Sequence, residues 1–353
     1  MNLYFENKRI TGVRSIFPQN LSTFEDEVVD PDSSRARRLK KVIGFGSRYR
    51  AKENTTVSDL VVYGTQTLIS DGYLDKDQIG AIVVVTLCPD YLLPQISSII
   101  HGELGLSKDV FCIDIPQACT GYIMGLTEAF MLLDHMKDKK VLLCTGEVLN
   151  RKTSKEPKVE HPSFGGDVAT ISIVENSDSS QNERILADIN YDGSRREALV
   201  IRHGGFRSPM TPEIISERWS NIPCTGVDMD GSGVFNFVQK EVPPMVKELA
   251  EKYGSPLDDF DYFLFHQPNR FMLQKLATAL NVPFEKMPMD ITENYGNSSG
   301  STIPVVMTER AKEDLKNKDN FCCLAGFGAG LSWGAVIMHI GNMKFCDSVI
   351  SEL

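Results

Sequence analysis

The sequence lacks several features that define whole classes of protein. No stretch of it reaches the roughly 18 consecutive apolar residues that a membrane-spanning helix needs, and no apolar segment follows a basic start at the N-terminus. Positive charge is scarce, with 37 basic against 47 acidic residues and a net charge of −10. This balance argues against a general nucleic-acid or anionic-membrane surface. We expect a cytoplasmic protein that binds neither nucleic acid nor membrane.

The eight cysteines lack the spacing of a disulfide framework or a zinc site. Most of them lie inside apolar runs, and none forms a Cys-x-x-Cys pair or has histidines at metal-ligand spacing. We therefore expect reduced thiols and no metal site.

Strand and helix patterns alternate along the 353 residues, which suffice for one large unit or two compact ones. Unbroken apolar runs at 79–86 and 140–146 are typical of buried strands, and stretches with helical spacing of apolar residues lie between such runs. The alternation predicts an α/β layer structure with a largely parallel sheet. We expect residues 203–225 to be irregular, and Pro243-Pro244 to split or kink the helix predicted at 231–253.

Cys119 lies in a short turn between a predicted strand and a predicted helix, within Phe111–Leu133. A thiol there points at the positive end of the helix and its unpaired N–H groups, which favour the thiolate and lower the pKa. The turn therefore indicates a nucleophile. The alternative is a small buried core residue, which is the commoner fate of a free cysteine.

Strand, turn and helix occur in the same order around His266, within Tyr262–Leu280. We expect the two halves of the chain to be structural duplicates that bring the turns of Cys119 and His266 to one site. A histidine after an apolar strand is also often a structural residue.

Two further stretches are unusual. Asn294–Ser301, which includes Asn297, is either part of a site or a polar turn that caps a helix. The glycine-rich stretch 326–334 lies between two predicted strands, so it does not fit a dinucleotide fingerprint, which needs a helix after the strand. We interpret it as a tight turn that brings backbone N–H groups near a reacting atom.

Gly296–Gly300 also matches the G-x-S-x-G pattern of serine hydrolases. The residues before it are polar where that motif needs an apolar strand, and the only later histidine, His339, lies inside an apolar run. We therefore disfavour a hydrolase.

Taken together, these stretches resemble the thiolase superfamily, and most closely the 3-oxoacyl-acyl-carrier-protein synthase III family. The matching pieces follow the family's order across nearly the whole chain. They are Ala118-Cys119-Thr120-Gly121, Phe164-Gly165-Gly166-Asp167, Met229-Asp230-Gly231, His266-Gln267-Pro268-Asn269, Tyr295-Gly296-Asn297-Ser298-Ser299 and Gly326-Phe327-Gly328-Ala329-Gly330 with Trp333-Gly334. The resemblance implies a thiolase-like fold with two duplicated βαβαβ halves in a layered α-β-α-β-α arrangement. The N-terminal half, at about 1–175, would carry the nucleophile, and the C-terminal half, at about 176–353, the histidine and the asparagine.

The resemblance also implies a catalytic triad of Cys119, His266 and Asn297. Cys119 would accept an acyl group from a thioester, and the backbone N–H groups of Cys119 and Ala329 would bind the oxyanion. Malonyl-acyl-carrier protein would then lose CO2, and its enolate oxygen would accept hydrogen bonds from His266 and Asn297. This chemistry belongs to fatty acid or related biosynthesis and needs no bound cofactor, since the substrates carry CoA or phosphopantetheine.

The family relationship further implies a homodimer, an acyl carrier protein as partner, and residues that contact the CoA or carrier part of the substrate. These candidate contacts are Arg151, Gly231, Lys41, Arg48, Leu93 and Arg270. A solvated face is the alternative for the basic ones. Leu93 falls in the region of the family's pocket-capping phenylalanine, where a smaller residue leaves room for a longer or branched primer.

The family grips the CoA nucleotide with a tryptophan from a segment that corresponds to about 35–48. No aromatic residue occurs here between Phe24 and Phe45. We therefore expect an acyl-carrier-protein thioester, rather than acyl-CoA, as the primer donor.

Two relatives separate from this chain on the same residues, and two other roles remain as alternatives. Thiolases use a second cysteine where this chain has Ala329, and hydroxymethylglutaryl-CoA synthases add a glutamate for which Glu103, Glu128 and Glu147 are equal candidates. A non-condensing acyltransferase, or an inactive subunit of a heterodimer, would share the fold. The residues after Asn342 extend past the family's usual end, and the sequence assigns them no function.

Overall fold

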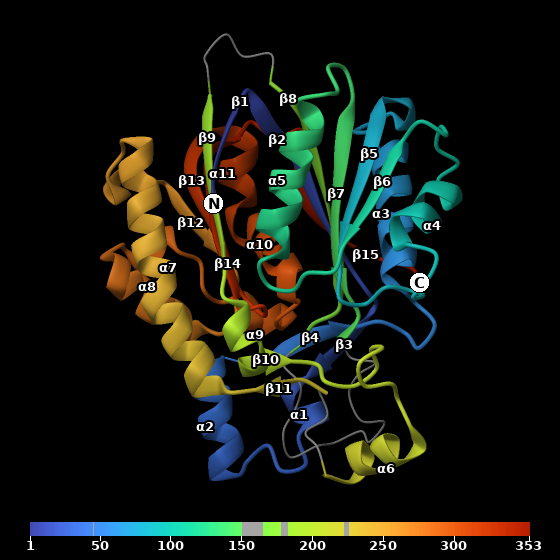
Figure 1. The fold of residues 1–353 in the computed structure, drawn as a ribbon, viewed down its shortest axis with the longest axis vertical. Helices are drawn as coiled ribbons and strands as arrows, with labels where there is room; N and C mark the ends of the chain where they lie inside the picture. Colours follow the sequence, from blue (N-terminus) through green and yellow to red (C-terminus); the bar gives the residue numbers. More distant parts are fainter. Residues whose placement is uncertain (45, 150–164, 178–182, 222–225) are drawn as a thin grey trace.

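The structure is a computed structural model, and it describes residues 1–44, 46–149, 165–177, 183–221 and 226–353. Two β-sheets stand face to face with helices between them and on both outer sides (Figure 1). The six-stranded sheet has the order β15 (Phe345–Ile350), β2 (Lys8–Phe17), β8 (Val168–Asn176), β7 (Lys140–Glu147), β5 (Ile79–Val85) and β6 (Phe111–Ile115). The five-stranded sheet has the order β1 (Asn2–Glu6), β9 (Arg184–Tyr191), β14 (Ser332–Gly341), β13 (Asp319–Gly328) and β12 (Tyr262–Phe265).

The helices complete five layers, which confirms the α-β-α-β-α arrangement. One core cluster joins α3 (Val57–Ser70) and α4 (Ile96–Glu103) to the six-stranded sheet, and another joins α7 (Gly231–Tyr253) and α8 (Arg270–Leu280) to the five-stranded sheet. A third cluster lies between the sheets, around α5 (Gly121–Leu133). Also in this middle layer are α10 (Thr302–Val306), a π-helical turn at Met307–Ala311 and α11 (Lys312–Asn317) (Figure 1).

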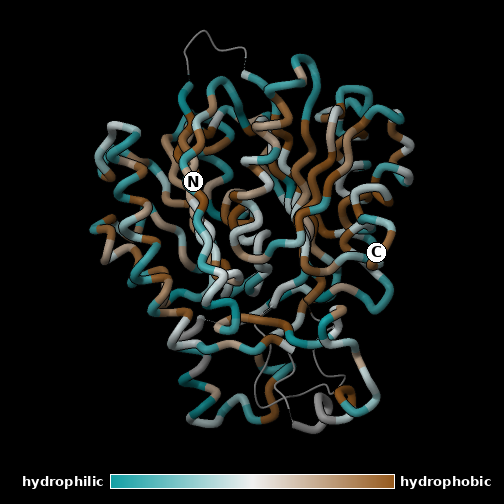
Figure 2. The backbone as a smooth tube through the Cα atoms, viewed as in Figure 1, coloured by the Kyte–Doolittle hydropathy of each residue, from teal (hydrophilic) through white to brown (hydrophobic). Residues whose placement is uncertain are grey.

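Hydrophobic segments are concentrated in the strands and in the helices between the sheets, and hydrophilic segments at the outer edges and connecting loops (Figure 2). Strand β5 is buried along its whole length, as its unbroken apolar run predicts. Because both faces of each sheet are covered by helices, the central strands are apolar on both sides.

The two sheets repeat one topology. In the larger sheet β2 pairs with β8 and β8 with β7 in antiparallel fashion, while β7 and β5 are parallel. In the smaller sheet β9, β14, β13 and β12 follow the same sequence of directions. By this order β12 corresponds to β5 and not to β6. The Cys119 turn follows β6 and the His266 turn follows β12, so our prediction that the two turns are equivalent parts of a duplication is wrong. The division of the chain at about residue 175 stays a prediction.

Each end of the chain adds a strand to the sheet that is formed mainly by the other half of the chain. Strand β1 pairs with β9 in the C-terminal sheet, and β15 pairs in parallel with β2 in the N-terminal sheet. The residues after Asn342 therefore have a structural role that the sequence did not reveal, because β15 adds an edge strand to the larger sheet.

Most of the predicted elements form. Helix α3 begins after Thr56, whose hydroxyl and the side chain of Asp59 make a reciprocal capping box. Helix α7, however, runs without a break through Pro243 and Pro244, because its apolar face packs along the smaller sheet and outweighs the two missing N–H donors. The region expected to be irregular contains α6 (Pro212–Asn221).

A smaller substructure covers one end of the layers (Figure 1). It contains the β3–β4 hairpin (Asn20–Thr23 and Ser47–Arg50), α1 (Phe24–Glu27), α2 (Ser34–Ile43), α6 and the short pair of β10 (Leu199–Val200) and β11 (Asp228–Met229). No helix among the described residues combines the length and the apolar character that crossing a membrane requires.

Candidate active site

Cys119 lies where strand β6 leads into the central helix α5. The strand ends at Ile115 and the helix begins at Gly121, so the cysteine lies at the N-terminal end of the helix as predicted. Two glycines on α5 let the helix approach the larger sheet. A β-carbon on Gly121 would stand 2.4 Å from Val85, and one on Gly125 would stand 2.5 Å from Leu143.

The glycine-rich turn between β13 and β14 packs directly on Cys119. A β-carbon built on Gly328 would lie 2.8 Å from Cβ and 3.1 Å from Sγ of Cys119, and one on Gly326 would lie 2.8 Å from its carbonyl oxygen. Any larger residue at these positions would displace the cysteine. Ala329, the predicted oxyanion donor, follows Gly328 in this turn, and its role stays a prediction.

Ser332 connects the glycine-rich turn between β13 and β14 to the turn that carries Cys119. Its hydroxyl donates to the carbonyl oxygen of Ala329 at 2.7 Å and lies 2.8 Å from the hydroxyl of Thr120. Ser332 is fully buried. Its two hydrogen bonds therefore hold Thr120, which follows Cys119, at a fixed separation from Ala329, the predicted oxyanion donor.

Ser299 joins the members of the predicted triad. Its hydroxyl lies 3.8 Å from Sγ of Cys119, and its backbone N–H donates to Oδ1 of Asn297 at 2.9 Å. Since a backbone N–H only donates, this bond identifies the amide oxygen of Asn297 and leaves its Nδ2 group for donation. Ser299 has a φ of 55°, in the left-handed region that non-glycine residues rarely adopt. We had assigned Ser299 no role from the sequence, although it lies in the polar stretch 294–301 that we had considered as part of a site.

His266 is buried immediately after strand β12. Its backbone N–H donates to Ala325 O at 2.8 Å, and its Nδ1 lies 2.7 Å from the hydroxyl of Thr302. Burial lowers the pKa of His266 to about 3, while a hydrogen bond with the backbone of Ser299 opposes that shift. The imidazole is therefore neutral at physiological pH.

The pKa of Cys119 differs in direction from our expectation. Burial raises the pKa of the thiol to about 11, and the nearby carboxylate of Glu147 adds to the rise. The hydrogen bond from Ser299 opposes this change without reversing it. Cys119 thus rests as a thiol, because desolvation of the sulfur outweighs the favourable helix end.

Glu147 is the glutamate that the structure brings near the nucleophile. It lies at the end of β7, is 1% exposed, and its two carboxylate oxygens lie 3.3 and 3.4 Å from the backbone N–H of Leu87. The alternative Glu103 is exposed on α4.

Other residues of the matching motifs have structural contacts. Asn269 caps α8 by accepting from the N–H of Met272, and Gln267 donates to the carbonyl oxygens of Phe265 and Pro288. Gly166 allows close approach of another loop, because a β-carbon there would stand 1.8 Å from Tyr295 O. These contacts position the His266 turn and the Asn297 turn.

Arg48 does not contact substrate phosphate. It is 1% exposed and forms a buried ion pair with Glu27, and it also donates to the carbonyl oxygen of Gly165 at 2.7 Å. Our assignment of Arg48 as a phosphate contact is therefore wrong. Burial lowers the pKa of its guanidinium, and Glu27 compensates.

The remaining predicted contacts are spread over the surface. Lys41 is exposed on α2, Arg270 forms an ion pair with Glu293 of α9 (Ile291–Tyr295), and Gly231 opens α7 after its cap Asp230. Leu93 is 85% exposed in the loop before α4. Arg151 lies outside the described residues.

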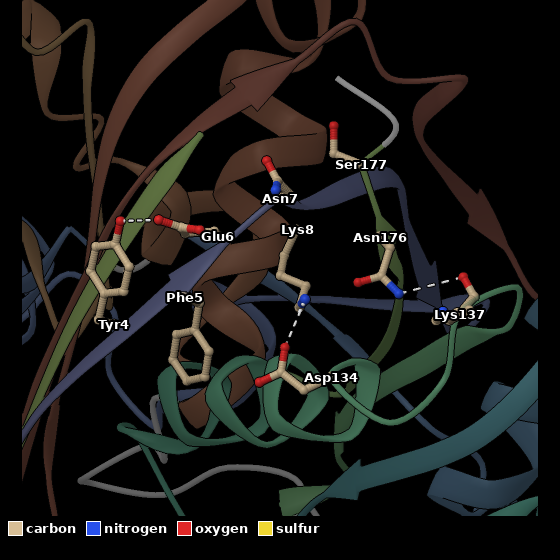
Figure 3. A pocket seen from close by; sticks show the side chains of 9 residues that line it. All are labelled: Tyr4, Phe5, Glu6, Asn7, Lys8, Asp134, Lys137, Asn176 and Ser177. Carbon is tan, nitrogen blue, oxygen red and sulfur yellow. Dashed lines mark hydrogen bonds and ion pairs between the residues drawn. The ribbon is translucent and has the colours of Figure 1, made fainter. Parts of the chain in front are cut away.

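A polar hollow lies at the opposite end of α5 from Cys119 (Figure 3). Its side chains are largely occupied with one another and with the backbone, since Lys8 pairs with Asp134 at 2.8 Å and Tyr4 bonds to Glu6. Asn176 donates to Met136 O at 2.8 Å beside it. The hollow therefore carries none of the predicted chemistry.

Comparison with known proteins points to one type of enzyme. Residues 250–340 match the family model described as 3-Oxoacyl-[acyl-carrier-protein (ACP)] synthase III C terminal. The chain is 29% identical over 337 residues to a beta-ketoacyl-acyl-carrier-protein synthase III of Streptococcus sanguinis, with coverage of 94% of this chain and 99% of the relative. A relative of the same name from Latilactobacillus sakei is 28% identical, with the same coverage.

Solved structures give the same result over the whole length. A crystal structure of a 3-oxoacyl-(acyl-carrier protein) synthase from Burkholderia xenovorans LB400 superposes with a TM-score of 0.88 at 29% identity, and covers 99% of both chains. A second structure, of a 3-oxoacyl-(acyl-carrier-protein) synthase III, has a TM-score of 0.82 at 26% identity.

Two sheets of one topology with helices between them define a thiolase-like fold, and the relatives named above make the chain an acyl-transferring enzyme of that fold. Within that class, the chain is similar over nearly its whole length to proteins named 3-oxoacyl- or beta-ketoacyl-acyl-carrier-protein synthase III, which are condensing enzymes.

Proposed function

We propose that this chain transfers an acyl group from a thioester to Cys119 and condenses it with malonyl-acyl-carrier protein to give a 3-oxoacyl thioester. The observation that carries the proposal is the set of contacts made by Ser299. One residue contacts the thiol of Cys119, the amide of Asn297 and, through Thr302, the ring of His266. A nucleophile is thus held beside an amide donor and an imidazole.

The chemistry then needs two steps. In the first, the sulfur of Cys119 forms a bond to the acyl carbon and the donor thiol leaves. In the second, the malonyl carboxylate leaves as CO2, its bonding electrons form an enolate, and the enolate carbon attacks the acyl group and releases the sulfur. Nδ2 of Asn297 donates to the enolate oxygen, as an amide can do at neutral pH.

Asn297→Asp tests the condensing role against simple acyl transfer. The substitution keeps the size of the side chain but replaces a donor with an acceptor-only carboxylate. We expect the variant to form the acyl adduct on Cys119 and to lose at least about 100-fold in 3-oxoacyl product. Equal condensation by the variant would show that Asn297 does not act in the condensing step. A wild type that forms the acyl adduct but no 3-oxoacyl product would favour the non-condensing alternative, and absence of both reactions in the wild type would favour an inactive heterodimer subunit.

We further propose an acyl-carrier-protein thioester as primer donor. The burial of Arg48 removes one candidate CoA contact. Helix α2 instead presents exposed cations and no acidic residue, on a chain whose net charge is −10, and an acidic carrier would complement them. The exposed cations are Arg35, Arg37, Arg38, Lys40 and Lys41.

If an acyl-carrier-protein thioester is the primer donor, the substrate preference of the enzyme should show it, and the cations of α2 should be its cause. The same acyl chain should prime more efficiently from carrier protein than from CoA. Arg37→Glu with Arg38→Glu should raise the KM for the carrier substrate, whereas Lys108→Glu, an exposed control on another face, should not. Priming by acyl-CoA at least as efficiently as by the carrier thioester would contradict the donor assignment.

We also propose a homodimer through the edge strand β6. Three consecutive apolar residues, Tyr91, Leu92 and Leu93, are 64%, 82% and 85% exposed in the loop beside this strand. Gln95 connects that loop to β6 by donating to Cys112 O at 3.1 Å. An unpaired strand edge next to an apolar loop is a typical surface for pairing with a second copy. Leu93 would then lie at the partner's acyl channel and influence primer size.

Leu92→Asp should convert the dimer to a monomer in analytical ultracentrifugation. Phe284→Asp is a matched control, because Phe284 is 50% exposed and lies elsewhere. A wild type that sediments as a monomer would contradict the dimer.

The setting we propose is the cytoplasm, with fatty acid or related biosynthesis as the pathway and no bound cofactor. The seven described cysteines are free thiols, as a reducing compartment maintains them.

A further inference from the structure

Thr302 has three hydrogen-bonding neighbours around a single hydroxyl group. Its Oγ1 lies 3.0 Å from Ser299 O, 3.2 Å from the backbone N of Gln267 and 2.7 Å from Nδ1 of His266. The residue is fully buried, as is His266 at 1% exposure. These contacts determine which atom carries each proton.

The hydroxyl of Thr302 has one proton to donate and two lone pairs with which to accept. The carbonyl oxygen of Ser299 only accepts, so it takes that proton, and the N–H of Gln267 only donates, so it occupies one lone pair. Toward His266 the hydroxyl therefore has only a lone pair left. The hydrogen bond between them then requires a proton on Nδ1 of His266.

A neutral imidazole carries a single proton, shared out between its two ring nitrogens. Since burial keeps the ring neutral, a proton on Nδ1 leaves Nε2 without one.

We propose that Thr302 is a positioning residue that holds His266 in the Nδ1–H tautomer, so that Nε2 of the resting enzyme is an acceptor. This inference rests on the proposed function for its mechanistic meaning, and it revises our expectation that His266 is a donor from the start. Nε2 donates to the enolate oxygen only after it has received a proton.

The thiol of Cys119 supplies that proton. As the sulfur bonds to the acyl carbon, its S–H bond breaks and the proton moves to Nε2, while the donor thiolate leaves and takes a proton from water. His266 is then a cation with N–H groups on both nitrogens. When condensation releases the sulfur of Cys119, Nε2 returns the proton and the resting tautomer is restored.

The tautomer can be read directly in solution. The full-length protein, labelled with 15N in its histidine rings, gives long-range 1H–15N correlations that distinguish protonated from bare ring nitrogens, and the absence of one set in His266→Gln assigns the signal. We expect a protonated Nδ1 and a bare Nε2 at pH 7 in the wild type and in Thr302→Ser, which keeps the hydroxyl. In Thr302→Val we expect a loss of this preference.

Kinetics provides the second measurement. Thr302→Val should slow acyl transfer to Cys119 by about 10- to 100-fold with little change in the KM of the acyl donor, and Thr302→Ser should restore most of the rate. A wild-type signal with the proton on Nε2 overturns the inference, and so does an unchanged tautomer in Thr302→Val. The NMR result does not depend on turnover, so a protein that shows the tautomer but forms no acyl adduct would refute the proposed function alone.

Discussion

Gly328 stands so close to Cys119 that a single added carbon would lie 3.1 Å from the sulfur. Gly328→Ala should therefore displace the nucleophile and lower the rate of Cys119 acylation by at least about 100-fold, as a shift of about 1 Å does at a reacting atom. The measurement is the rate of adduct formation by mass spectrometry. Gly102→Ala is the control, since nothing lies within 4 Å of a β-carbon at that position. Equal rates for the two variants would show that the glycine turn does not set the position of the sulfur.

The raised pKa of Cys119 predicts the pH dependence of its reactivity. Only the thiolate reacts with iodoacetamide, so the alkylation rate should still be rising at pH 9, above the inflection at about 8.5 of a free cysteine. Cys119→Ser provides the background from the other thiols. A rate that has reached its plateau by pH 7 would mean that the helix end dominates after all.

Glu147→Gln should shift the same profile to lower pH. The substitution removes a negative charge whose effect is to raise the pKa of Cys119, and it keeps the size and hydrogen-bonding capacity of the side chain. An unchanged inflection in the alkylation profile would show that this carboxylate does not act on the sulfur.

The lowered pKa of His266 predicts instability in acid. In the unfolded chain the imidazole takes up a proton below about pH 6.5, whereas in the folded protein it stays neutral down to about pH 3. The stabilisation is thus present above pH 6.5 and is lost as the pH falls toward 3. Between pH 7 and pH 4 the loss is on the order of 3 kcal/mol.

Urea denaturation at a series of pH values measures this loss. His266→Gln, which cannot titrate in this range, should lose less stability over the same interval. Parallel curves for the wild type and the variant would mean that the histidine is protonated in the folded protein.

The buried pair of Arg48 and Glu27 should support the fold and not the binding of CoA. Arg48→Met leaves a buried carboxylate with a weaker set of partners, so we expect a loss of about 3 kcal/mol in unfolding free energy. The KM for an acyl-CoA should change little. Lys41→Met, on the exposed side of α2, is the control for stability. A raised KM with unchanged stability would restore the phosphate role.

The apolar patterns carried most of the fold. The apolar runs at 79–86 and 140–146 form the predicted strands β5 and β7, which are buried because helices cover both faces of the sheet. The edge strands β1 and β15 were missed, since short strands at a sheet edge have no distinctive pattern and depend on partners far away in the chain.

The residue types of the candidate site could be predicted from the sequence, but the protonation state of its thiol and the partners of its charged residues could not. Local patterns indicated Cys119 and left His266 and Asn297 open. The family resemblance implied the three as a triad, and the structure joins them through Ser299. The state of the thiol depends on burial and on Glu147, which is separated from Cys119 by 28 residues of sequence, so helix position alone gave the wrong direction. Arg48 failed for a similar reason, because its partner Glu27 lies in a different element.

The most direct test of the account is the intact mass of the purified protein after mixing with acyl-carrier and acyl-CoA thioesters of different chain length, with Cys119→Ser as the control. We predict an increase of one acyl mass in the wild type, none in the variant, and transfer of that acyl group into a 3-oxoacyl product once malonyl-acyl-carrier protein is added. An adduct that persists in Cys119→Ser, or a wild type that gains no mass from any donor, would contradict the assignment of Cys119 as the nucleophile.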